Sequence, residues 1–152
     1  MTRRLMPLVA LLAIPGAWML FSTPTADRYV TPPAVADTVI VLVGEFQPAA
    51  REGRGSVQIL RLASGQMIAR VSGLATGGGN DMRLYLLGAA RVNNAAELER
   101  VGFVDLGAPR LTGRDEIYVI PPNTPLTRVR AIAVWDRDGN LNFTSAELRP
   151  PR

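Results

Sequence analysis

The hydrophobic pattern of the chain is clearest between Arg128 and Leu148. Apolar residues fill both alternating faces of the run 129–135, which predicts a strand covered on both sides. The polar corner 136–140 (Asp-Arg-Asp-Gly-Asn) contains residues that tolerate left-handed backbone angles, so we expect a hairpin whose second strand returns through Phe143. This hairpin is the predicted spine of the core.

Shorter apolar runs come before it, separated by glycine and proline turns. Val57 and Ile59 alternate with polar neighbours, and Leu84 and Leu86 face opposite to Arg83 and Tyr85. Strands are predicted over 38–43, 56–62, 67–71, 82–87, 102–105 and 116–120. One helical pattern interrupts them, at 95–98, where Asn93 is the predicted cap. Many short strands with almost no helix predict an all-β domain, an antiparallel β-sandwich or barrel-like fold, preceded by an N-terminal apolar helix.

That helix is predicted over the uncharged run from Leu5 to Phe21, which follows Arg3 and Arg4. A basic start before an apolar run is typical of an export signal, and the arginines are expected to stay in the cytoplasm. As a helix the run spans roughly 25 Å, on the short side for a bilayer core of about 30 Å. An uncleaved anchor, a cleaved signal with weak cleavage sites and a buried core helix therefore stay open.

The chain thus divides into a signal-anchor or export signal (1–22), a Pro-rich linker (23–37), a β domain (38–149) and a tail (150–152). The expected location is the cell membrane, crossed once, with the domain on the periplasmic or extracellular side. Secretion after signal cleavage is the alternative.

Composition narrows the chemistry of this domain. The chain has no cysteine, no histidine and no lysine, so all 17 basic residues are arginines. Disulfides, thiolate nucleophiles, zinc-thiolate sites, imidazole bases and lysine Schiff bases are excluded. We therefore expect no enzymatic activity of a common kind.

The net charge of +4 does not indicate nucleic-acid binding. Beyond residue 26, 15 arginines accompany 13 acidic residues and are scattered singly among them, with no basic run and no aromatic platform. The expected partners are the membrane, through Leu5 to Phe21, and an unidentified protein or small molecule.

Several short motifs occur in an order that resembles a known family. They are Gly44-Glu45-Phe46; Gly55-Ser56-Val57 with Ile59; Gly79-Asn80-Asp81-Met82 with Leu84-Tyr85-Leu86; Asp105-Leu106-Gly107 with Leu111-Thr112-Gly113; Ile117-Tyr118 with Ile120-Pro121; and Val134-Trp135 with Phe143, Ala146 and Leu148. Together they resemble the DM-thirteen electron-transfer domain family of secreted and membrane-tethered proteins. The resemblance runs from Gly44 to Leu148 and implies a β domain with a role in electron transfer.

The sequence departs from this family directly after Trp135. The family pattern has a cysteine there, thought to act as a redox thiol or to hold a prosthetic group, whereas this chain has Asp136. A carboxylate neither forms a disulfide nor cycles through sulfenic acid. Thiol redox chemistry and thiolate-held haem are therefore excluded. Asp136, Trp135 and Asp81 remain the candidate cofactor-binding residues; no cofactor is predicted, although haem or a metal bound in another way stays open.

A calcium site is the alternative use of the same corner. The residues Asp136, Asp138, Asn140, Asn142, Thr144 and Glu147 occupy the ligand positions of an EF-hand loop. However, Leu141 stands where that loop needs glycine, and the flanks are predicted strands rather than helices. A polar hairpin turn is the preferred interpretation, and a cation site at Asp136, Asp138 and Asn140 is kept as the alternative. Asp81 is likewise more typical of a turn cap than of a ligand.

Three hypotheses follow from the sequence. The first is a membrane-tethered extracytoplasmic module that acts as a non-catalytic binding or accessory domain. The second is an accessory electron-transfer protein whose redox group is supplied by a partner or by an unrecognised cofactor. The third is a calcium-stabilised adhesion or binding domain. The surroundings of Asp136 decide whether the domain retains a site at this position. A closed cleft with convergent polar groups would indicate a retained site, whereas an open hairpin tip would not.

Overall fold

The computed structural model describes residues 38–152. The predicted N-terminal apolar helix and Pro-rich linker lie outside the described residues. The described part contains the strands β1 (Val39–Pro48), β2 (Gly53–Arg61), β3 (Met67–Thr76), β4 (Met82–Leu87), β5 (Phe103–Gly107), β6 (Glu116–Val119), β7 (Ala131–Asp136) and β8 (Leu141–Glu147). It also contains the helix α1 (Ala95–Val101) and the 3-10 turn η2 (Leu126–Arg128).

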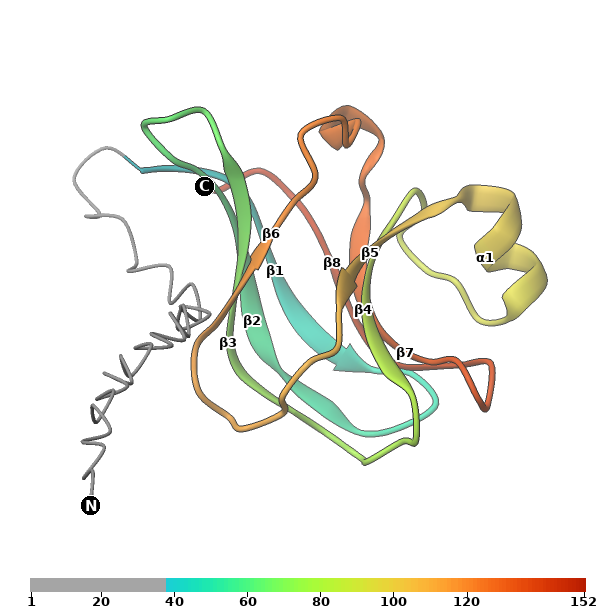
Figure 1. The fold of residues 1–152 in the computed structure, drawn as a ribbon. Helices are drawn as coiled ribbons and strands as arrows, with labels where there is room; N and C mark the ends of the chain where they lie inside the picture. The colour runs from blue at the N-terminus through green and yellow to red at the C-terminus, as the bar shows by residue number, and fades with distance from the viewer. Residues whose placement is uncertain (1–37) are drawn as a thin grey trace, which may run out of the picture. The chain divides into compact units, whose positions relative to one another are not determined.

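The eight strands form one antiparallel sheet in the order β5-β4-β7-β8-β1-β2-β3-β6. This sheet curls until its two edge strands, β5 and β6, face each other (Figure 1). Within residues 38–152 the two edges touch, but no ladder of hydrogen bonds joins them. The fold is therefore a nearly closed β-barrel, and the all-β prediction is confirmed.

Strand β1 connects the two halves of this barrel. Its first part pairs with β2, from Val39 opposite Arg61 to Glu45 opposite Ser56, and its last three residues pair with β8. The predicted strand ended at residue 43, before Gly44, whereas β1 continues to Pro48. Gly44 belongs inside the strand because an added Cβ would lie 2.6 Å from the Glu147 carbonyl oxygen of β8. In the sequence this glycine indicates the end of a strand, but in the structure it allows two strands to approach each other closely.

Strand β7 is the spine that the hydrophobic pattern predicts, since all six of its residues are buried. Its two faces contribute to different hydrophobic clusters. Ile132 and Val134 pack inside the barrel with Leu84 and Leu86 of β4. Ala131, Ala133 and Trp135 pack on the outer side of the sheet with Tyr85, Leu87, Val92 and Leu98. The strand is covered on both sides, as expected.

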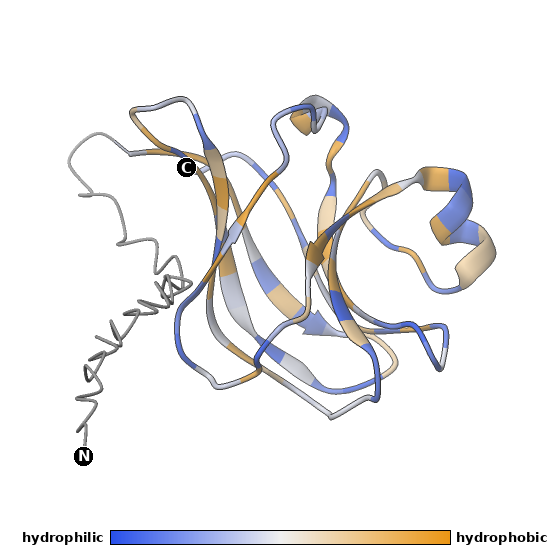
Figure 2. Cartoon of the chain, viewed as in Figure 1, coloured by the Kyte–Doolittle hydropathy of each residue, from blue (hydrophilic) through white to orange (hydrophobic). Residues whose placement is uncertain are grey.

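Helix α1 provides the outer cover of β4 and β7. Leu98 is its buried residue, and hydrophobic and hydrophilic positions alternate around it (Figure 2). The predicted cap was wrong by one residue: Asn94 caps the helix, and its side-chain oxygen accepts a hydrogen bond of 3.0 Å from the Glu97 amide. The Asn93 amide instead donates to the Glu97 carboxylate at 2.8 Å, so Glu97 also fixes the residue before the cap.

Among residues 38–152, no helix combines the length and the apolarity that are needed to cross a bilayer.

Candidate functional site

Asp136 lies at the end of β7 with only 7% of its surface exposed. Its Oδ1 atom accepts a hydrogen bond of 3.1 Å from the Asp81 amide, and Oδ2 accepts one of 3.2 Å from the Gly139 amide. The carboxylate therefore joins the loop before β4 to the turn between β7 and β8. Gly79 packs against it so closely that an added Cβ would lie 3.0 Å from Oδ1.

Asp81 and Arg137 close the same junction from the solvent side. The Arg137 Nε atom donates to the Asp81 Oδ2 atom at 2.7 Å, and the Arg137 amide donates to the Asp81 carbonyl at 3.0 Å. The carboxylate of Asp81 is thus occupied by a guanidinium group. The structure brings Asp136 and Asp81 together, as the candidate site requires, but it does so through structural hydrogen bonds.

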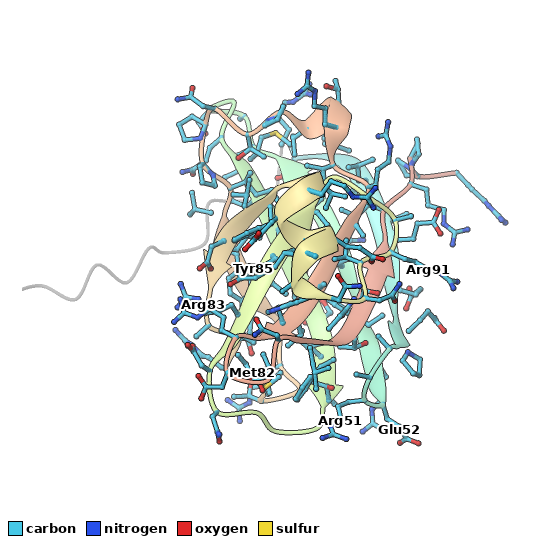
Figure 3. The ribbon with its side chains drawn as sticks, turned by 90° about the vertical axis from the view of Figure 1, so that its right-hand side faces the viewer. Arg51, Glu52, Met82, Arg83, Tyr85 and Arg91 are labelled. Carbon is cyan, nitrogen blue, oxygen red and sulfur yellow. The ribbon has the colours of Figure 1, made fainter. Side chains whose placement is uncertain are left out.

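Trp135, the third candidate, is separated from this junction. Only 1% of its surface is exposed, and it packs in the outer cluster with Tyr85 and Leu98. Successive strand residues point to opposite faces, so Trp135 and the Asp136 carboxylate are not neighbours on one face. Met82, which Figure 3 shows at the lower end of β4, uses its sulfur to accept a contact of 3.0 Å from the Gly79 amide.

The residues of the calcium template are dispersed between buried and exposed positions. Asn142 and Thr144 are buried in β8 and hydrogen-bond the Val92 carbonyl at 2.9 Å and the Gln47 carbonyl at 2.7 Å. Asn140 adopts a left-handed conformation, with φ 50°, and completes the predicted turn. Across residues 38–152, nowhere do three acidic, histidine or cysteine side chains gather as they would around a metal ion.

Another polar pair lies within β6 and is joined to the loop before this strand. The Tyr118 hydroxyl donates a short hydrogen bond to the Glu116 carboxylate, which also accepts one of 3.0 Å from the Arg110 amide. Burial raises the pKa of Tyr118 far above its ordinary value, and the hydrogen bond to Glu116 raises it further. The phenol is therefore held protonated.

The structure also contains a cleft that the sequence motifs do not reveal. It encloses about 590 Å³ over the outer face of β1 and β8, and it is lined by Glu45, Gln47, Pro48, Ala49, Ala50, Ala90, Arg91, Asn93, Asn142, Ser145, Glu147 and Arg149. The predicted strand ended at residue 43. A prediction that continued past Gly44 would have indicated this polar face, because Glu45 and Gln47 alternate with the buried Phe46. Asp136 and Asp81 are not among the lining residues.

The fold and the candidate site together define a cysteine-free β-barrel module, in which the residue after the buried tryptophan hydrogen-bonds backbone amides. The model of the family described as Electron transfer DM13 matches residues 45–148. This match covers more than half of the chain, so the protein belongs to the electron transfer DM13 family, which its motifs resemble. Searches of curated proteins and of solved structures found no match.

Proposed function

We propose that this member of the family is a membrane-tethered extracytoplasmic module that acts as a non-catalytic binding or accessory domain. The observation that supports this role most directly is the environment of Asp136. At the position where the family resemblance places a cysteine, a buried carboxylate accepts hydrogen bonds from two backbone amides. Such a group stabilises loops and supplies no thiol for electron exchange.

The tether is supported by the basic start and apolar run of the sequence, and it is tested by cell fractionation. The full-length chain is expected in the membrane fraction, with its β domain accessible to protease added from outside. A variant without residues 1–37 is expected to remain in the cytoplasm. Recovery of the full-length chain in the cytoplasmic fraction would contradict this part of the proposal.

Electron transfer through a redox group that a partner or an unrecognised cofactor supplies is the second candidate, and it is favoured by membership of the family. It is tested with the purified full-length chain after growth with haem and metal supplements. The proposed binding role predicts no visible absorption band and no change when a chemical reductant is added. A reducible band that copurifies with the chain would favour the second candidate over the first.

A further inference from the structure

The cleft over β1 and β8 is lined by charged groups of both signs, and its other lining side chains are mostly small or polar. Its volume of about 590 Å³ lies within the range of small-molecule sites. Strands β1 and β8 form the floor, the β1–β2 turn forms one wall, and the loop before α1 forms the other. Figure 3 shows Arg91 on that loop, on the side of the sheet where β8 and β1 run.

The floor presents two carboxylates at one cross-strand position. Phe46 pairs with Ala146, and Val43 bridges to Arg149, so Glu45 and Glu147 fall opposite each other on the outer face. Both side chains are exposed, and both line the cleft. Like charges directly opposite each other destabilise a sheet, and a cationic group placed between them would remove this cost.

Two arginines match these two negative charges: Arg91 lies on the loop before α1, and Arg149 lies on the floor, where it is bridged to Val43. Arg91 and Arg149 line the cleft, and neither forms an ion pair with Glu45, Glu147 or any other acidic residue of the described range. The three ion pairs found in residues 38–152 are elsewhere, at Arg70–Asp115, Arg83–Asp105 and Arg137–Asp81. The cleft thus holds two acidic and two basic groups that are not paired with each other.

The Asn142 side chain holds one wall of the cleft in place and has one polar atom without a hydrogen-bond partner. Its amide nitrogen donates to the Val92 carbonyl at 2.9 Å, which ties the loop before α1 to β8. Its Oδ1 atom is enclosed and has no hydrogen-bond partner among the described residues. An acceptor left in this state costs stability, and a small adjustment toward a donor in the cleft would satisfy it.

From these groups we infer that the cleft binds a small zwitterion that carries an ammonium and a carboxylate, such as a free amino acid or a short peptide. The ammonium lies between Glu45 and Glu147, and the carboxylate faces Arg149, which follows Glu147 by two residues on the same face of the sheet. The lining contains no aromatic residue, so it has no platform for stacking a base or a sugar ring, whereas Ala49, Ala50 and Ala90 fit small apolar side chains. This inference deepens the proposed binding role and rests on it.

The test is calorimetric titration of the full-length chain in detergent with L-alanine and with three forms of one dipeptide. These forms are L-alanyl-L-alanine, its N-acetyl derivative and its C-terminal amide. The zwitterionic dipeptide is expected to bind, and blocking either end is expected to weaken binding by at least about tenfold, because each end loses its charged partners. Comparison with L-alanine shows whether the free amino acid suffices or a peptide is needed.

A double variant, Glu45→Gln with Glu147→Gln, is expected to lose binding while its melting temperature stays equal or rises, since the cross-strand repulsion is removed. Glu99→Gln, an exposed position of α1 outside the cleft, is the matched control and should bind as the unchanged chain does. Equal binding of blocked and free dipeptides, no binding of any form, or unchanged binding by the double variant would overturn the inference. Fractionation and the visible spectrum test the proposed function separately, because neither depends on the cleft.

Discussion

Asp136 shows how one residue type determines what a position in a fold can do. Its carboxylate has two oxygens, and each accepts a hydrogen bond from a different loop. A cysteine has one sulfur, which is a weak acceptor, so it would not hold both amides in the same way. The aspartate at this position therefore holds two loops together and supplies no thiol.

Replacing Asp136 by alanine is therefore expected to destabilise the domain. The Asp81 and Gly139 amides would lose their acceptor. A hydrogen bond to a charged group contributes about 1.5 to 3 kcal/mol, and both bonds are partly exposed to solvent, so the free energy of unfolding should fall by about 2 to 4 kcal/mol in total. Chemical denaturation measures this change. Asp138→Ala, on the exposed part of the same turn, is the control and should stay within about 0.5 kcal/mol of the unchanged chain. Equal stability of the two variants would refute the role given to Asp136.

The residue identities at this junction were predictable from sequence, but their arrangement was not. Asp136 and Asp81 stood out because one follows the buried tryptophan and the other follows a glycine loop. The hydrogen bond between them joins residues 55 positions apart, and only the pairing of Met82 with Asp136 across β4 and β7 brings them together. Local pattern contains no information about that register.

At the scale of elements, the sequence predicted strands best where alternation and turn residues agree. The β7–β8 hairpin is an example, because its apolar run and its Asn140 turn point to the same structure. Strand β1 was cut short because Gly44 resembles a stop, although the close approach of β8 is what requires glycine there. The cap of α1 was misassigned because Asn93 and Asn94 are adjacent and chemically identical. The structure identifies Asn94 as the cap, because its backbone is extended, with φ −147° and ψ 167°, and its side chain accepts a hydrogen bond from the Glu97 amide.

These neighbouring asparagines provide a direct test of the cap. Asn94→Ala removes the side-chain acceptor of the Glu97 amide and should lower the free energy of unfolding by about 1 kcal/mol. Asn93→Ala keeps the backbone amide through which Asn93 takes part, so its effect should be smaller by a factor of two or more. Denaturant titration of both variants measures the two changes. A larger decrease in the free energy of unfolding for Asn93→Ala than for Asn94→Ala would show that Asn93 is the cap.

At the scale of the whole molecule, the absence of lysine and cysteine gives an unusual alkaline titration. The three tyrosines are the only side chains with ordinary pKa values near 10. Burial raises the pKa of Tyr85, and burial together with the Glu116 hydrogen bond raises that of Tyr118 still more. The third, Tyr29, lies outside the described residues. Among the described residues, the change in the free energy of unfolding at alkaline pH therefore depends mainly on the buried phenols of Tyr85 and Tyr118.

The sign of the pH effect follows from linkage. Because the pKa of Tyr118 is higher in the folded protein, the unfolded chain loses this proton first as the pH rises. The stabilisation is complete below about pH 10 and is lost as the pH rises above that value. Unfolding measured from about pH 8 to pH 11 should show this decline, and Tyr118→Phe should make it shallower.

Tyr85→Phe serves as the comparison and is expected to remove a smaller part of the decline. Phenolate absorbance, followed in the same samples, should show Tyr118 ionising only as the domain unfolds. A decline of equal steepness in the unchanged chain and in Tyr118→Phe would contradict the assignment.

The cleft belongs to this scale too, because no single element contains it. Its two strands, β1 and β8, stand at opposite ends of the β domain in sequence, and the third contribution comes from the loop before α1. Predicting it would have required the pairing of Gln47 with Ser145. A search for local motifs finds residues such as Asp136 and overlooks a surface assembled in this way.

The barrel is not closed by hydrogen bonds between its edge strands β5 and β6, so it can open along the line between them. Six of the strands have ladder partners on both sides, so widening the barrel between any of them would break hydrogen bonds. Between β5 and β6, separation costs only side-chain contacts, such as those of Val104 and Leu106 with the interior. The barrel is therefore expected to open most readily along this line, and the connection 108–115 limits how far β5 and β6 can separate.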